Sequence, residues 1–173
     1  AREAQKRRLV AGARRALASQ AVHLGWLLLE WDNLLAAASV AKAARDHEAA
    51  LWLAAAVAYC PNGGQPALDD LDTLMASVPR HVDGEARGVA QWARGEVLRR
   101  LDRVDQALTT WRQTLSTCPV LCVQRRVVGS LVDLSITRME LEESERWLVE
   151  FVRLGGSPEE VLFFRARVHA ARG

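Results

Sequence analysis

The sequence predicts an all-α fold of antiparallel helical hairpins, stacked as a right-handed superhelix (an α-solenoid) of about eight or nine helices. Alanine, leucine, arginine and glutamate dominate the chain, and these residues favour helices because they lose little side-chain freedom there. Alternating runs of valine, isoleucine and threonine, which are typical of strands, are missing. Short breaks rich in proline and glycine separate the apolar segments, and loops this short force consecutive helices to pack antiparallel.

Each helix follows from the spacing of apolar residues between these breaks. Pro61, Pro119 and the segments 79–84 and 155–158 interrupt the helical pattern. The last segment also favours a new helix, because Ser157 suits the N-cap and is followed by proline and two glutamates. The pattern predicts helices over residues 2–18, 21–44, 46–59, 66–77, 85–100, 103–116, 120–137, 141–154 and 158–171.

Length, charge and cysteine content limit the classes of protein to which this chain can belong. A chain of 173 residues with a net charge of +2 fits one domain over residues 1–173 and lacks the basic excess of general nucleic-acid binders. The most apolar stretch, residues 51–60, is too short to cross a bilayer, and no apolar signal-peptide core follows the basic start. Three cysteines without a dense framework favour a reducing compartment. We therefore expect a cytoplasmic protein that does not enter the membrane.

The segment 88–121 has the length of a tetratricopeptide repeat, about 34 residues. It places small residues, Gly95 and Ala107, on its two helices, and large residues, Leu98 and Trp111, one turn after each of them. Small residues let two helix backbones approach, and large residues fill the remaining space. This segment is the best repeat in the chain.

A second unit spans residues 30–63, with Ala49 and Leu53 as the small and large residues and Pro61 as the closing proline. The repeat pattern weakens elsewhere. The other segments are expected to be N-terminal helices over 1–29, a degenerate half-repeat over 64–87 and degenerate C-terminal helices over 122–173.

A resemblance to a known family rests on two blocks. Residues 30–37 read EWDNLLAA and residues 46–51 read DHEAAL, and together they resemble the start of the helical-repeat region in bacterial STAND-class signalling ATPases and transcription regulators. Residues 95–115 resemble the next repeat of that family, whereas Arg45 stands where the family has glycine. The phosphate-binding loop is missing. The resemblance therefore implies a sensor or scaffold part of such a protein, without its nucleotide site.

No residue constellation predicts an enzyme, a metal site or a cofactor. Cys118 and Cys122 are close in sequence, but no second Cys/His pair stands nearby to complete a zinc site. Cys60 and Cys118 occupy equivalent repeat positions, so we expect both to be buried thiols that do not meet as a disulfide. The four histidines are scattered, and the acidic cluster at residues 69–72 is expected to compensate a helix dipole.

The expected partner site is the concave face of the superhelix. In the repeat register Trp92 faces this groove, and an exposed tryptophan beside arginine is a common anchor of protein interfaces. The alternative is that Trp92 packs under the helix at 67–77. The residues expected to contact a partner are Trp31, Trp92, Glu96, Arg99, Arg100 and Arg126.

We therefore expect a protein-interaction and regulatory module that binds a protein, a peptide or a neighbouring domain. One alternative is nucleic-acid binding through the basic first helix, which carries Arg2, Lys6, Arg7, Arg8, Arg14 and Arg15. Another is a small-molecule sensor with its ligand near Trp31 and Trp92.

The last helix predicts a further contact. It carries Val161, Leu162, Phe163, Phe164 and Val168, which is more apolar surface than a polar capping helix requires. We expect this end to contact another protomer, giving self-association through the C-terminal helix, or a missing domain.

Overall fold

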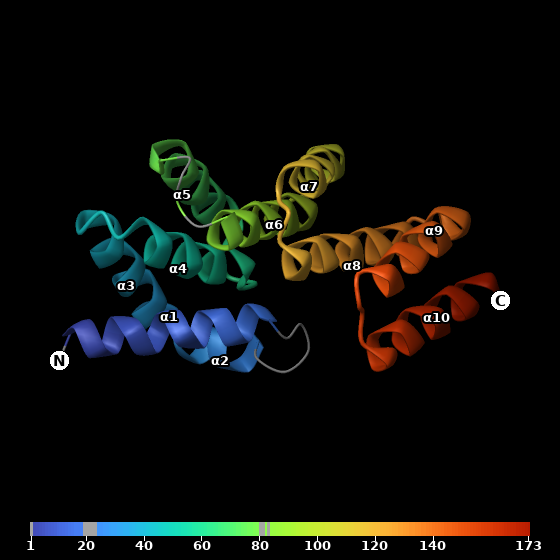
Figure 1. Cartoon of the computed structure of the whole chain (residues 1–173), viewed down its shortest axis with the longest axis horizontal. Helices are drawn as coiled ribbons and strands as arrows, with labels where there is room; N and C mark the ends of the chain where they lie inside the picture. The colour runs from blue at the N-terminus through green and yellow to red at the C-terminus, as the bar shows by residue number, and fades with distance from the viewer. Residues whose placement is uncertain (1, 19–23, 80–81, 83) are drawn as a thin grey trace. The chain divides into compact units, whose positions relative to one another are not determined.

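The computed structural model describes residues 2–18, 24–79, 82 and 84–173. These residues form helices and no strands, which confirms the predicted all-α class (Figure 1). The described helices are α1 (Arg2–Ala18), α2 (Leu24–Leu29), α3 (Trp31–Ala43), α4 (His47–Tyr59), α5 (Gly64–Ser77), α6 (Gly84–Arg100), α7 (Val104–Thr117), α8 (Leu121–Thr137), α9 (Leu141–Arg153) and α10 (Pro158–Arg172).

The chain divides into two compact units, residues 1–110 and 111–173, and the division falls inside α7. The superhelical stacking and the repeat boundaries stay predictions. The small and large residues of the repeat pattern are buried as expected, including Leu98, Ala107 and Trp111.

The single helix expected at 21–44 is two helices in the described part of that range, whereas residues 19–23 lie outside the described residues. Glu30 separates α2 from α3 with φ −96° and ψ 10°. The backbone bonds continue across it, since the Glu30 N–H donates to Trp26 O at 2.9 Å and Leu34 N–H donates to Glu30 O at 2.8 Å. Glu30 is therefore a local distortion of one helical path, which the apolar pattern does not reveal.

The first unit is built around α4, whose residues from Ala49 to Ala58 are all buried. A helix that is apolar on every side has to be enclosed by others, and α4 packs against α1, α3, α5 and α6. Its many alanines suit this position because small side chains allow close approach of neighbouring backbones. Cys60, which follows α4, and Cys118 are both buried and outside any disulfide, so the expectation for both cysteines is confirmed.

One type of turn ends four helices. After α3, α6, α8 and α9, a residue with a positive φ angle follows the helix, and its neighbour donates to the carbonyl five residues earlier. This pattern is the Schellman motif, which usually has glycine at the left-handed position. The left-handed residues are Arg45 (φ 55°), Asp102 (φ 58°), Met139 (φ 59°) and Gly155 (φ 76°).

The second unit has its own apolar core between α8, α9 and α10. Phe151 and Phe164 meet edge to face with their ring centroids 5.4 Å apart. Gly156 is required beside this pair, since a Cβ atom there would lie 2.2 Å from the Phe151 ring. The predicted cap of α10 is confirmed: Glu160 N–H donates to Ser157 Oγ, and Ser157 N–H donates to Glu160 Oε2, both at 3.2 Å. The turn between α9 and α10 is therefore tightly specified.

Candidate functional site

Trp92 on α6 is a core residue and not an exposed anchor, so this part of the expected groove is corrected. Its side chain is 1% exposed, and its ring stacks on Tyr59 at the end of α4 with centroids 4.9 Å apart. The α6 helix is buried on nearly all sides, because α4 and α5 both pack against it. The predicted repeat alignment, which left the Trp92 face of α6 open to a partner, is therefore wrong for this helix.

The three charged residues expected beside Trp92 make hydrogen bonds within the first unit. Glu96 is buried and accepts a hydrogen bond from Arg99 at 3.0 Å. Arg100 donates from Nη1 to the carbonyl oxygens of Tyr59 at 3.0 Å and Cys60 at 2.8 Å, and from Nη2 to that of Ala58. The Ala58 and Tyr59 carbonyls belong to the last turn of α4, where a helix leaves its acceptors without partners of its own. Cys60 O also accepts from Gly63 N–H at 2.9 Å. Burial of the guanidinium lowers the pKa of Arg100.

The other two expected contact residues lie elsewhere. Trp31 is half-buried on α3, which packs against α4 and α1, and Arg126 is buried on α8 in the second unit. Of the expected set, Trp92, Glu96 and Arg126 are buried, Trp31 and Arg99 are half-buried, and Arg100 is exposed.

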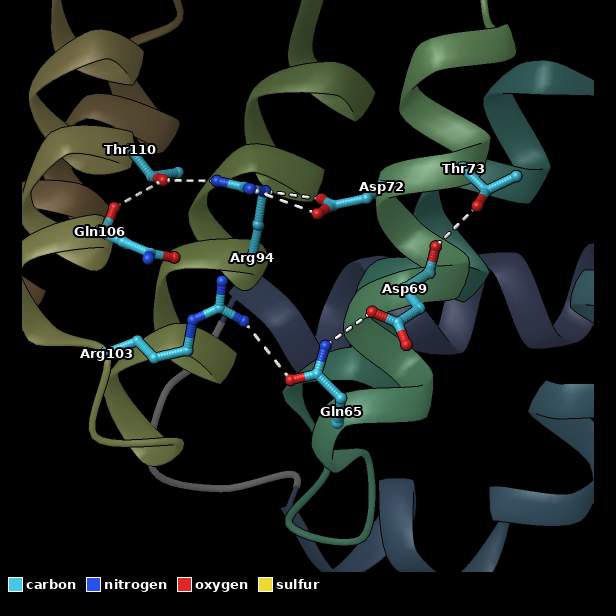
Figure 2. Close-up of polar contacts among 8 residues, drawn as sticks. All are labelled: Gln65, Asp69, Asp72, Thr73, Arg94, Arg103, Gln106 and Thr110. Carbon is cyan, nitrogen blue, oxygen red and sulfur yellow. Dashed lines mark hydrogen bonds and ion pairs between the residues drawn. The ribbon is translucent and has the colours of Figure 1, made fainter.

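Polar residues of α5, α6, the α6–α7 turn and α7 form two separate hydrogen-bonded groups, together called the seam (Figure 2). Arg94 donates to both carboxylate oxygens of Asp72, at 2.6 and 3.2 Å, and to Thr110 Oγ1 at 2.7 Å. Farther along, Arg103 donates to Gln65 at 3.4 Å, and Gln65 donates to Asp69 at 2.6 Å. The seam explains why a polar residue stands at position 94, where the repeat pattern favours an apolar one. Because its groups satisfy one another, we assign the seam to helix packing.

The basic first helix is partly neutralised by carboxylates of the same unit. Lys6 donates to Asp46 at 2.7 Å, and Arg8 donates to Glu30 at 3.4 Å. Arg14 pairs with Glu48 and lies over the Trp52 ring, with 5.1 Å from Cζ to the centroid. These pairs attach α1 to its neighbours and reduce the positive charge that a phosphate backbone requires. Arg2 has a placed backbone, but its side chain lies outside the described residues.

An open groove of about 690 Å³ runs between α9 and α10 in the second unit. Leu148 and Val168 lie on its inner side and are buried in the core. Val149 and Val152 line the same groove from α9 but remain 71% and 48% exposed. Valine on a solvent-facing helix position contributes nothing to the core, so this exposed apolar pair marks the groove as a candidate binding surface.

The α10 side of the groove is basic. Arg165, His169 and Arg172 line it at successive turns, and Arg172 donates to Glu145 of α9 at 2.7 Å. Residues at i, i+4 and i+7 share one face of a helix, so these three side chains form a row opposite the two valines. Arg165 and His169 are exposed. The groove therefore combines an apolar strip on α9 with a row of two arginines and a histidine on α10, and Glu145 of α9 pairs with one of these arginines.

Sequence reasoning missed this groove. The spacing of Val149 and Val152 on α9, together with the basic row on α10, was the available signal. Valine three residues from another valine is equally typical of a buried helix face. Only the packing of Leu148 and Phe151 inward, which rotates the valines outward, distinguishes the two cases.

Comparison with protein-family models, with curated proteins and with solved structures found no match to this chain. Within the described residues, no set of three or more histidine, cysteine, aspartate or glutamate side chains is arranged to hold a metal ion. None of the described helices combines the length and the apolar character that crossing a membrane requires.

Proposed function

We propose that this chain is a protein-binding module that receives an amphipathic helix in the groove between α9 and α10. The observation that carries the proposal is the exposed pair Val149 and Val152 beside the basic row of α10. A helix laid into such a groove buries its own apolar residues, which recur at i, i+3, i+4 and i+7, against the groove floor. No covalent chemistry is involved.

The charges define the partner further. Arg165, His169 and Arg172 lie along one edge, so a partner helix with carboxylates beside its apolar stripe places unlike charges together. Complementary charge chiefly gives specificity and faster association. A partner with lysines at the same positions is disfavoured by repulsion.

The wider setting of this binding rests on the resemblance of the first unit to the repeat region of STAND-class proteins. There the module is the sensor or scaffold part of a bacterial signalling or transcription-regulatory protein in the cytoplasm. Occupation of the groove then changes the balance between two states of the complete protein, which requires a difference in affinity for those states.

Two synthetic amphipathic peptides test the groove. Each carries the same leucine stripe and a fluorescent label, and is about 15 residues long, which matches a helix of about 22 Å. One peptide has glutamates and the other lysines beside the stripe. Fluorescence anisotropy should show tighter binding of the glutamate peptide, and binding should weaken as salt is raised because the edge charges are exposed.

A double variant, Val149→Glu with Val152→Glu, should abolish binding of the glutamate peptide. Val40→Glu on α3 is a matched control, since Val40 is also an exposed valine but lies in the other unit. Equal binding by both variants, or preference for the lysine peptide, contradicts the proposal. A small apolar molecule that competes for the groove would instead favour a sensor function.

A further inference from the structure

The outward face of α10 exposes apolar side chains that no described helix covers. Leu162 is 64% exposed and Phe163 is 58% exposed, whereas Phe164 and Val168 of the same helix are buried in the core. Farther along this outward face come Ala166 and Ala170, both exposed. This face adjoins the α9–α10 groove, because His169, which lines the groove, lies seven residues after Leu162. Ala166 and Ala170 lie on the side of α10 that does not line the groove.

The order of side-chain sizes along this face is self-complementary. Leu162 lies four residues before Ala166, and Ala170 lies four residues after it. If α10 of a second copy is placed antiparallel across a two-fold axis at Ala166, each Leu162 meets the partner's Ala170. A large residue then fills the space that a small one leaves, as helix packing requires, and the same patch serves both copies, as in an isologous interface.

The charges along α10 favour the same antiparallel arrangement. Its first turn carries Glu159 and Glu160, and its last turn carries His169 and Arg172. Antiparallel pairing brings the acidic turn of one copy to the basic turn of the other, and also opposes the two helix dipoles. Parallel pairing would bring like charges together. Arg172 already pairs with Glu145, but a guanidinium has five N–H donors and can hold a second carboxylate.

We infer that this chain forms a two-fold symmetric dimer through antiparallel contact of α10 with α10 of a second copy, centred on Ala166. The inference goes beyond the proposed function, because its partner is a second copy of this chain and its centre, Ala166, does not line the groove. The contact is small, so the dimer forms reversibly as protein concentration rises.

Sedimentation equilibrium of the whole chain tests the dimer at protein concentrations up to about 1 mM. The average mass should rise from 19.1 kDa towards twice that value. Ala166→Glu places two carboxylates at the two-fold axis and should raise the dissociation constant by about tenfold or more. Ala4→Glu, at an exposed alanine of α1, should leave it unchanged. Circular dichroism verifies that both variants keep their helical content.

A cross-linking experiment gives an independent result. In a Cys122→Ser background, Ala166→Cys should form a covalent dimer when a mild oxidant such as a copper–phenanthroline complex removes two electrons and two protons from the paired thiols. Val149→Cys, on the groove side, should cross-link much less. A chain that stays monomeric throughout the concentration range, or a dimer that is indifferent to Ala166→Glu, overturns the inference. Loss of peptide binding in the Val149 and Val152 variant with dimerisation intact separates the two proposals.

Discussion

The Trp92 ring stacks on Tyr59, with the ring centroids 4.9 Å apart and the planes inclined by 28°. This contact joins the middle of α6 to the last turn of α4, the most enclosed helix of the first unit. A tryptophan that is 1% exposed contributes to folding through its burial and aromatic packing. Substitution of Trp92 should therefore lower the stability of the fold, and any effect on binding should follow from that.

We predict that Trp92→Ala lowers the free energy of unfolding by about 3–5 kcal/mol, because it removes a buried indole and leaves a cavity. Trp92→Phe should cost clearly less, since an aromatic ring remains against Tyr59. Urea unfolding followed by far-ultraviolet circular dichroism measures both. A Trp92→Ala protein as stable as the wild type would contradict the core position.

Arg100 gives a second prediction, because its guanidinium reaches three carbonyl oxygens at the end of α4. Arg100→Lys keeps the charge but cannot reach all three acceptors from one ammonium group. We expect a loss of about 1–2 kcal/mol in the free energy of unfolding, at the lower end of the range for hydrogen bonds to charged groups because the site is partly exposed.

The matched control is Arg99→Lys one position earlier. Arg99 pairs with Glu96 on its own helix, and lysine can also make a single ion pair. Its effect on the midpoint of urea unfolding should be smaller than that of Arg100→Lys. Equal effects of the two changes would argue that the bonds to α4 add little.

The sequence predicts most helix ends but not the orientation of α6 or the α9–α10 groove. Ser157 illustrates the success, because capping depends on a few neighbouring residues and can be recognised locally. Trp92 illustrates the failure. Which face of a helix is exposed depends on how many helices surround it. The polar residues of α6 suggest an exposed helix, but they can be buried because hydrogen bonds satisfy them, as at Arg94.

The exposed valines of the groove could not be predicted for a related reason. Val149 and Val152 have the spacing of core residues, and α9 needs only one apolar face for the core of the second unit. The apolar surface predicted on the last helix is present only in part: Leu162 and Phe163 are exposed, whereas Phe164 and Val168 are buried in the core of the second unit. What covers that surface stays a prediction.

Asp46 predicts a dependence of stability on pH. It accepts a hydrogen bond from Lys6 and caps α4 by accepting one from Ala49 N–H. The hydrogen bond from Lys6 is the main cause that lowers the pKa of Asp46 below its usual value near 3.8, and the bond from Ala49 N–H lowers it further. A carboxyl group whose pKa is lower in the folded chain stabilises the fold above its unfolded pKa, and this contribution is lost as pH falls through the folded pKa.

We therefore expect the wild type to lose more stability than Asp46→Asn between about pH 5 and pH 2. Asparagine also caps helices well, so Asp46→Ala should cost about 1 kcal/mol more than Asp46→Asn at neutral pH. Urea midpoints measured across the pH range give both differences. Parallel pH profiles for the wild type and Asp46→Asn would show that the carboxylate is not the titrating group.

Arg45 supplies the last prediction, because its backbone lies in the left-handed region, with φ 55°. Its N–H donates to Lys42 O at 3.0 Å, and the next N–H, that of Asp46, donates to Ala41 O at 2.9 Å. This is the glycine position of the Schellman motif, and the left-handed conformation costs an L-residue roughly 1–2 kcal/mol. Arg45→Gly removes that strain but adds chain entropy in the unfolded state, which offsets part of the gain.

The net expectation is a gain of about 0.5 kcal/mol in the free energy of unfolding, seen as a higher urea midpoint. Arg45→Ala is the matched control, because it also removes the exposed guanidinium but keeps the Cβ atom that causes the strain. It should give no gain. If alanine stabilises the chain as much as glycine does, the benefit comes from removing the charge, and the left-handed turn is not a source of strain.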